Sequence, residues 1–260
     1  MTESTEQKLL RVAKEIAEKA RTGGVHLKLF GGLAVWEHCP NSRIVAGLSR
    51  ELPLDIDFVA DCGSAERVVN LMVGIGFASG RWSYTQMRFA APIKVNGKDR
   101  ELTCDVQFGE LNFSHCIAIR KDLRDDHFSI PLVELLLSKL QIHEFQKKDL
   151  LDVVMLLREH EFGQDDVDKI DSPVLLKCCN RDWGLSTNVT ENLVAVSEYL
   201  SSISCITNQD KATISARVEE FRSLLTNSPK TWRWKMRALI GRRRPWWRTV
   251  EYDAMVDSCI

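Results

Sequence analysis

The sequence predicts an α+β fold whose second half is α-helical. Up to about residue 160, the patterns follow the order helix, strand, helix, strand, helix, hairpin and two helices. After about residue 165, apolar residues recur only at helical spacing. Strands gathered in one half of a chain and helices in the other are typical of an α+β protein.

The N-terminal elements are predicted from caps, periodicity and turn residues. Ser4 and Gln7 fit a capping box, so a first helix is expected over residues 5–21. A strand (25–30), the Gly31-Gly32 turn (31–32) and a short helix (33–39) are expected next. A loop (40–53), a second strand (54–60) and a helix capped by Ser64 (65–77) follow.

A hairpin and a series of helices complete the expected elements. The runs 83–95 and 100–108 flank Asn96-Gly97, which is a strong hairpin signal. Uninterrupted helical patterns follow over residues 132–145, 147–160, 173–179, 190–200 and 212–225.

The composition indicates an ordinary soluble protein. The chain has 260 residues, of which 44% are hydrophobic and 27% charged, enough for one large or two modest domains. It contains no apolar run near the ~18–20 residues of a membrane span, and its N-terminus lacks an apolar signal core, so a cytoplasmic protein without a membrane partner is expected. The eight cysteines include no CxxC pair, which favours reduced thiols.

Positive charge is concentrated near the C-terminus. Residues 230–248 hold eight Lys or Arg and no acidic residue, whereas the remainder of the chain is acidic. The four tryptophans of this segment could be core anchors or base-stacking platforms. Trp232, Met236 and Leu239 fall at helical spacing, which predicts that this part packs on the body. A second set of residues is expected to be exposed and to bind nucleic acid: Arg242, Arg243 and Arg244.

Three aspartates are the strongest candidates for chemistry. Asp55 and Asp57 alternate with apolar residues in one strand, so both side chains point to one face of the sheet. If the strand carrying Asp105 pairs beside them, three carboxylates converge there. Hard oxygen ligands suit Mg²⁺, and a pair of such ions can support in-line phosphoryl displacement. The Gly31-Gly32 turn would let a phosphate approach the backbone closely.

This combination resembles the nucleotidyltransferase superfamily, whose best-known members are the β-type polymerases. Residues 132–156 are similar to the helix pair of the abortive-infection class of nucleotidyltransferase toxins, so the resemblance covers about residues 25–160. It implies a mixed sheet with flanking helices in a catalytic domain, expected over 1–128, followed by a helical domain over 129–260 that carries the basic, Trp-rich segment.

The resemblance also implies roles for single residues. Asp55 and Asp57 would hold the catalytic Mg²⁺ or Mn²⁺, and Asp105 would complete a metal site and help to deprotonate the acceptor hydroxyl. Lys139 would steady the phosphates of the NTP, and Asp149 would line the same pocket. Two further residues would contact the triphosphate, namely Gly31 and Gly32.

The sequence departs from the pattern of this class in two places. An Arg and a Ser or Thr usually stand just before the first Asp, whereas Arg50 lies five residues ahead of it and Pro53 takes the hydroxyl position. The loop 40–53 is therefore expected to bind a different acceptor. Cys104 beside Asp105 is unusual, which makes the third carboxylate the least secure of the three.

The resemblance implies transfer of a nucleoside monophosphate from an NTP to an acceptor hydroxyl, with release of pyrophosphate. The acceptors, in order of expectation, are RNA such as a tRNA end, a protein side chain, and a small molecule such as an antibiotic. One alternative is a toxin held inactive by an antitoxin, and another is a silent module that binds a nucleotide or partner. Lys139 and Asp149 suit a structural salt bridge equally well, Lys148 suits a surface pair with Glu144, and packing is expected for His38.

Overall fold

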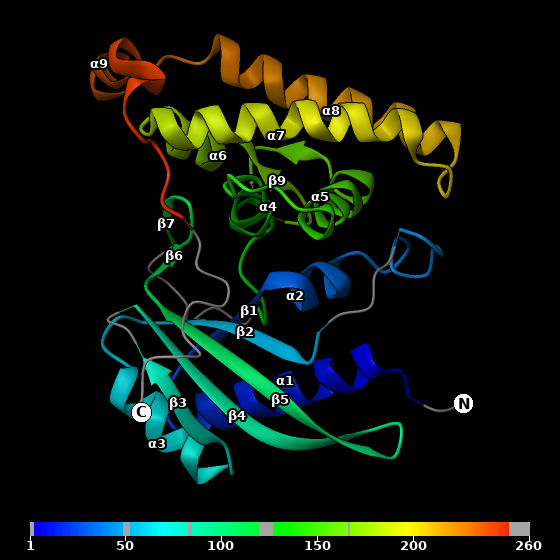
Figure 1. Ribbon diagram of the computed structural model, residues 1–260, viewed down its shortest axis with the longest axis vertical. Coiled ribbons are helices and arrows are strands. Elements are labelled where there is room, and N and C mark those ends of the chain that lie inside the picture. The colour runs from blue at the N-terminus through cyan, green and yellow to red at the C-terminus, as the bar shows by residue number, and fades with distance from the viewer. Residues whose placement is uncertain (1–2, 49–52, 83–84, 120–126, 166, 250–260) are drawn as a thin grey trace.

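A computed structural model describes residues 3–48, 53–82, 85–119, 127–165 and 167–249. A twisted sheet with its flanking helices forms one half of the molecule, and a helical layer forms the other (Figure 1). The predicted fold class, a mixed sheet with flanking helices followed by a helical region, is confirmed.

The N-terminal elements follow the expected order. Helix α1 (Thr5–Thr22) begins with the predicted capping box, in which Ser4 and Gln7 cap each other's backbone N–H groups. Strand β1 (Leu27–Phe30) leads directly into α2 (Gly31–His38), so the two glycines form the first turn of that helix and not a separate turn before it.

The central sheet is mixed. It contains β1, β2 (Asp55–Ala60), β3 (Ala78–Trp82), β4 (Gln86–Val95) and β5 (Lys98–Phe108), in the order β1-β2-β5-β4-β3. Strands β2 and β5 are parallel, and every other neighbouring pair is antiparallel. Two small pairs lie outside it, namely β6 (Glu110–Asn112) with β7 (Cys116–Ala118), and β8 (Phe162–Gly163) with β9 (Ile170–Asp171).

The hairpin that joins β4 to β5 is the predicted one. Asn96 and Gly97 both have positive φ, 50° and 74°, which is the geometry that an Asn-Gly hairpin turn requires. The turn pairs Val95 with Lys98 and so sets the register of the whole β4–β5 ladder. The edge strand β3 was not expected, because its sequence lacks an alternating pattern and its pairing comes only from β4.

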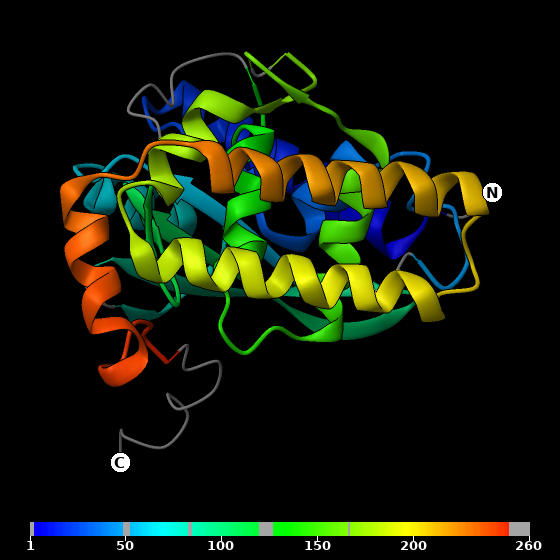
Figure 2. The same cartoon turned by 90° about the horizontal axis from the view of Figure 1, so that it is seen from above.

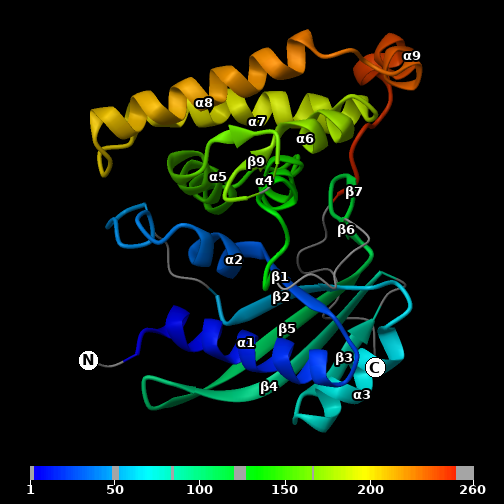
Figure 3. The same ribbon diagram turned by 180° about the vertical axis from the view of Figure 1, so that it is seen from behind.

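Helices cover both faces of the sheet. Helix α1 and helix α3 (Ala65–Gly74) lie against one face (Figure 3). Ser64 precedes α3, but its hydroxyl donates to the Asp61 carbonyl oxygen at 2.6 Å, so the predicted side-chain cap is wrong. The buried Ile56 and Phe58 of β2 point away from the face that carries Asp55 and Asp57.

The second half is helical, as predicted. It contains α4 (Leu132–Leu140), α5 (Lys147–Glu159), α6 (Ser172–Cys179), α7 (Trp183–Ser202), α8 (Asn208–Asn227) and α9 (Trp232–Ile240), followed by the 3-10 turn η1 (Gly241–Arg243). Helices α7 and α8 run side by side, and α9 crosses one end of that pair (Figure 2). Helix α4 ends at Leu140 and not at residue 145, so a short connection separates it from α5.

One cluster of buried apolar side chains runs through both halves. It includes side chains on both sides of the proposed domain boundary at 128/129. The chain at this boundary, residues 128–130, is hydrogen-bonded to β1. The Leu29 N–H donates to the Phe128 carbonyl, and the Ile130 N–H donates to the Leu29 carbonyl, each at 2.9 Å. Within the described residues, no helix combines the length and the apolar character needed to cross a membrane.

Candidate active site

The three candidate aspartates lie on adjacent parallel strands. Strand β5 pairs directly beside β2, as the sequence analysis required, and Asp57 stands opposite Asp105 in the register. Asp55 lies two residues before Asp57 and opposite Thr103. Because side chains alternate along a strand, all three carboxylates point to the same face of the sheet.

Gly31 allows the Asp57 carboxylate to lie against the start of α2. Gly31 has a φ of +75°, and a Cβ built on it would be 2.1 Å from the Asp57 Oδ2. Any side chain here would displace the carboxylate as well as strain the backbone. Phe30, the N-cap residue of α2, has no polar side-chain group with which to cap the first N–H groups of the helix. The β1–α2 junction therefore combines a close approach to Asp57 with a helix start suited to an anion.

The electrostatics around Asp57 disfavour its charged form. Burial, followed by the neighbouring carboxylates of Asp55 and Asp105, raises the pKa of Asp57 to about 8. Lys139 and Arg88 act in the opposite direction but do not compensate. A cation bound between the carboxylates would favour their charged forms.

Arg88 holds the third carboxylate in a bidentate ion pair. Its Nε donates to Oδ1 of Asp105 at 2.8 Å, and its Nη2 donates to Oδ2 at 2.7 Å. This pairing raises the pKa of the guanidinium. The Arg88 side chain is 51% exposed whereas that of Asp105 is 10% exposed, so a half-exposed guanidinium holds a buried carboxylate.

The carboxylates open into a cavity of about 410 Å³. Its walls come from the β1–α2 junction, from β2, β4 and β5, and from the α4–α5 pair. Its polar lining residues besides the three aspartates include Gln86, Arg88, Gln107, Asn112, Ser138, Lys139, Lys148, Asp149 and Thr249. Gly31, Gly32 and Pro53 also line it. The cavity therefore brings together every catalytic and nucleotide-binding residue that the sequence predicted.

Lys139 forms a buried ion-pair network with α5. Its Nζ lies 2.8 Å from the Asp152 Oδ2 and 3.9 Å from the Asp149 Oδ1. All three side chains are buried, with exposed fractions of 11% for Lys139, 6% for Asp149 and 3% for Asp152. The two hypotheses for Lys139, a structural salt bridge and a phosphate contact, are compatible, because the same side chain also lines the cavity.

Lys148 belongs to the cavity as well. Glu144 precedes α5, which begins at Lys147, so Glu144 and Lys148 do not lie on one helix as the predicted pair assumed. Lys148 lines the cavity together with Lys139. His38 packs as expected, with its Nε2 2.6 Å from the Ser129 hydroxyl.

The basic C-terminal segment is anchored by its second pair of tryptophans. Trp247 stacks on His143 with ring centroids 3.6 Å apart, and the Trp246 Nε1 donates to the Asn188 Oδ1 at 3.0 Å. The three arginines expected to be exposed and to bind nucleic acid are all exposed, namely Arg242, Arg243 and Arg244. Arg242 also pairs with Glu191.

The first half of this segment does not pack as predicted. Trp232, Met236 and Leu239 are exposed on α9, Trp232 at 72% and Leu239 at 74%. The helical spacing was right, but it places these side chains on the outer face of the helix. The inner face is made by Trp234 and Arg237, the latter lying over the Trp183 ring at 4.9 Å.

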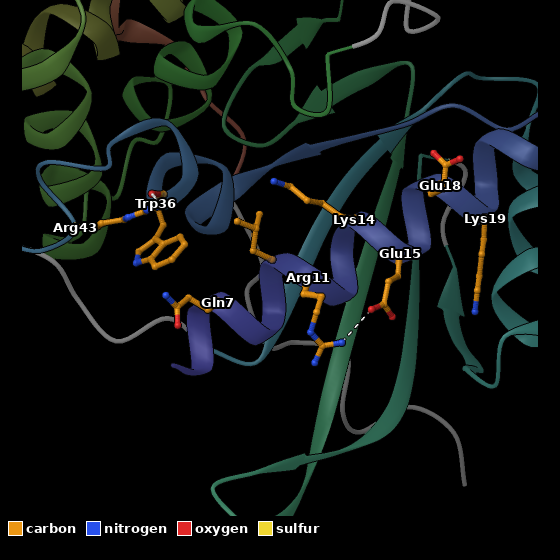
Figure 4. Close-up of a pocket in the computed structure, with 9 residues that line it drawn as sticks. Gln7, Arg11, Lys14, Glu15, Glu18, Lys19, Trp36 and Arg43 are labelled. Carbon is orange, nitrogen blue, oxygen red and sulfur yellow. Dashed lines mark hydrogen bonds and ion pairs between the residues drawn. The ribbon is translucent and has the colours of Figure 1, made fainter. Parts of the chain in front are cut away.

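A second, shallower hollow lies along α1. It measures about 680 Å³ and is lined by Gln7, Leu10, Arg11, Lys14, Glu15, Glu18, Lys19, Trp36 and Arg43 (Figure 4). Several of its charged groups already have protein partners: Arg11 pairs with Glu15 at 2.9 Å, Lys14 with Glu37 at 2.8 Å, and Glu18 with Arg21 at 2.7 Å. We assign no site to it.

Sequence reasoning missed several residues of the cavity. Arg88 could have been predicted from the hairpin register. The Asn96-Gly97 turn pairs Val95 with Lys98, and seven residue pairs further along the ladder Arg88 lies opposite Asp105. Asp152 lies one helical turn after Asp149 and could have been inferred as a second partner of Lys139. Gln86 and Gln107 follow from the same ladder, in which they pair directly. Arg50, which departs from the family pattern, lies outside the described residues.

No family model and no curated protein matches this chain. Three solved structures are similar in fold. JHP933 from Helicobacter pylori is 12% identical over 92% of this chain and 97% of its own length, with a TM-score of 0.45. An antigenic nucleotidyltransferase-like protein from Paracoccidioides brasiliensis is 12% identical over 86% and 94%, with a TM-score of 0.41. The lincomycin-bound lincosamide antibiotic adenylyltransferase LnuA is 16% identical over 60% and 98%, with a TM-score of 0.37. At these values, the function of the chain has to be inferred from its own side chains around the cavity.

Proposed function

We propose that the chain is a divalent-metal-dependent nucleotidyltransferase, which moves a nucleoside monophosphate from an NTP to an acceptor hydroxyl. The observation that carries this proposal is the meeting of two sets of charges in one cavity. Asp55, Asp57 and Asp105 supply carboxylates from the sheet, and Lys139 and Lys148 supply ammonium groups from the α4–α5 region. Phosphoryl transfer needs both, since it depends on positioning and on neutralising charge.

The carboxylate pair on β2 fits a hard cation. Its donors are oxygens, and the pKa of Asp57 is raised first by burial and then by the carboxylates of Asp55 and Asp105, whose repulsion a bound cation would offset. Among the described residues, no group of three His, Cys, Asp or Glu side chains is arranged to hold a metal ion. The carboxylate oxygens of Asp105 already accept hydrogen bonds from Arg88. Asp55 and Asp57 would therefore hold Mg²⁺ or Mn²⁺, which would supply positive charge against the phosphate oxygens.

The triphosphate would lie between the start of α2 and the two lysines. Gly31 and Gly32 keep side chains away from the first turn of α2, whose N–H groups and dipole favour an anion. Lys139 is held in place by its ion pair with Asp152, so it would contact phosphate without first being ordered. Asp149 lines the same part of the cavity.

The acceptor would enter on the β4–β5 side of the carboxylates. Gln86, Arg88 and Gln107 offer amide and guanidinium groups there for a hydroxylated molecule. The acceptor oxygen forms a bond to the α-phosphorus, the bond to the bridging oxygen of pyrophosphate breaks, and a carboxylate helps to remove the hydroxyl proton. Asp105, which lies beside Gln86 and Gln107 in the sheet, would take this proton once Arg88 releases it.

Labelling tests the proposal and identifies the acceptor. The chain is incubated with each α-labelled NTP, Mg²⁺ or Mn²⁺, and total RNA, cell lysate or a panel of hydroxylated antibiotics. We expect metal-dependent pyrophosphate release and label in one acceptor class, with RNA ranked first, and loss of both in Asp55→Asn and Asp57→Asn. If both variants turn over as the wild type does, the proposed site is wrong.

A specific observation favours a second candidate, a catalytically silent nucleotide-binding module. Arg88 and Lys139 already have carboxylate partners, so the site is partly neutralised by its own side chains. Such a module would bind NTP without releasing pyrophosphate with any acceptor. A toxin restrained by an antitoxin would instead stop growth when expressed alone in the cytoplasm, and the Asp57→Asn variant would not.

A further inference from the structure

Helix α9 presents an apolar face to solvent. Four side chains form it, and we call them the α9 stripe: Trp232, Met236, Leu239 and Ile240, exposed at 72%, 55%, 74% and 41%. At 3.6 residues per turn they fall within one narrow sector of the helix. Four exposed apolar side chains grouped on one face of a helix form a candidate binding surface.

Positive charge borders the stripe on both sides. On the helical wheel, Arg233 follows one edge of the stripe and Lys235 the other, and both are exposed. Arg243 and Arg244 extend the positive charge beyond the end of the helix. We call these four residues the basic collar. The segment that carries the stripe, residues 230–248, contains no acidic side chain, and Glu191 of α7 pairs with Arg242 beyond the end of the helix.

The stripe belongs to a helix that is fixed to the body. At its start, the Thr231 N–H and hydroxyl both donate to the Asn180 carbonyl, at 3.1 and 2.9 Å. After its end, Arg242 pairs with Glu191, and Trp246 bonds to Asn188. Helix α9 lies at a corner of the molecule, across the ends of α7 and α8 (Figures 1 and 2). The exposed stripe is therefore a built surface at a protruding position.

We propose that α9 binds an anionic phospholipid surface. The positive charge of the collar is complementary to the negative charge of such a surface. The long collar side chains can reach the headgroups while the stripe enters the boundary of the acyl chains. Four side chains on a helix ~13 Å long supply much less than the ~800 Å² per partner of a standard protein interface. A bilayer requires no shape complementarity, so a short convex stripe is sufficient. Apolar side chains at the centre of a basic surface fit a bilayer better than RNA, whose backbone would leave them in water.

Vesicle flotation of the full chain tests the proposal. We expect the protein to float with vesicles of phosphatidylcholine and phosphatidylglycerol, to remain behind with phosphatidylcholine alone, and to be released by high salt. Trp232→Ser/Leu239→Ser should weaken binding by about tenfold or more. Arg233→Gln/Lys235→Gln should weaken it by roughly fivefold per charge.

Matched variants control for lost apolar surface and lost charge elsewhere. Ile44→Ser removes an equally exposed apolar side chain, and Lys19→Gln/Lys98→Gln removes two exposed charges, so neither should change flotation. Circular dichroism checks that each variant is folded. The proposal is overturned if the wild type does not float with anionic vesicles, or if the stripe variant floats as the wild type does. It is also overturned if the stripe variant loses RNA binding or self-association while vesicle binding is unchanged.

Discussion

The protonation of Asp57 depends on its surroundings. Burial and the carboxylates of Asp55 and Asp105 raise its pKa, and Lys139 and Arg88 only partly offset them. Gly31 leaves room for its carboxylate. A carboxyl group held in this way makes the folded protein sensitive to pH and to cations. This sensitivity can be measured without knowing the substrate.

The free energy of unfolding should fall as the pH rises from about 5 to 8. Between its ordinary pKa of 3.8 and its folded pKa of about 8, Asp57 keeps a proton in the folded state that the unfolded chain has lost. The decline should be at least ~1 kcal/mol, since each pKa unit is worth about 1.4 kcal/mol. Urea denaturation at several pH values measures it.

Asp57→Asn should remove most of this decline, because the amide does not titrate. Asp99→Asn, at an exposed hairpin position, is the matched control and should retain it. Adding Mn²⁺ should also restore stability to the wild type near pH 8. An Asp57→Asn protein with the same pH dependence as the wild type would contradict this assignment.

Arg88 would compete with a bound cation for Asp105, because its guanidinium already holds both carboxylate oxygens. We predict that Arg88→Ala tightens Mn²⁺ binding by about threefold to tenfold, because Asp105 becomes available and a nearby positive charge is removed. Titration followed by electron paramagnetic resonance gives the affinity directly. Arg100→Ala, an exposed arginine on the same hairpin, should change nothing. Unchanged affinity in Arg88→Ala would show that Asp105 is not a ligand.

At the scale of elements, the α4–α5 pair places a cation beside the sheet. Lys139 on α4 is held by Asp152 on α5, while Lys148 and Asp149 come from the first turn of α5. Residues 141–146 separate the two helices, which pack against each other, so that Lys139 of α4 meets Asp149 and Asp152 of α5.

Lys139→Ala should destabilise the protein by about 3 kcal/mol, because it leaves buried carboxylates without their cation. Lys139→Met/Asp152→Leu should recover most of that stability, since an apolar pair can replace a buried ion pair. If Lys139 also contacts phosphate, NTP affinity stays low in the double variant. Thermal denaturation and NTP titration of both variants, with Lys147→Ala as an exposed control, separate the two roles. Recovery of stability and NTP affinity together would leave Lys139 a structural role only.

The whole molecule is joined across the expected domain boundary. Leu29 of β1 pairs with the chain at residues 128–130, and one buried cluster runs through the sheet half and the helical half. The two regions on either side of the expected boundary, 1–128 and 129–260, therefore share a core, and the candidate cavity is lined by residues of both.

We predict one unfolding transition for the full chain. Far-ultraviolet circular dichroism, which follows the helical half most strongly, and the fluorescence of Trp36 in the sheet half should give coincident curves. The fluorescence is measured in a variant whose other tryptophans are phenylalanine. A fragment of residues 1–128 should not fold by itself, because it would expose the β1 edge and part of the core. Two separated transitions, or a folded fragment, would contradict this prediction.

The fold class could be predicted because its signals are local. The Ser4–Gln7 capping box, the Asn96-Gly97 turn and the Asp55/Asp57 alternation each act over a few residues. Boundaries were less accurate where packing decides them, as at the end of α4. Strand β3 could not be found, because an edge strand without an alternating pattern is defined by its neighbour.

The sequence by itself determined which residues could do chemistry: the aspartates of β2 and β5, the glycines at the start of α2, and Lys139. Their types, alternation and order along the chain are enough for that. The tertiary structure alone decided their partners. Arg88 on Asp105 and Asp152 on Lys139 depend on which strands and helices lie side by side. It also decided that the apolar spacing of α9 faces solvent, since periodicity defines the face of a helix but not what covers it.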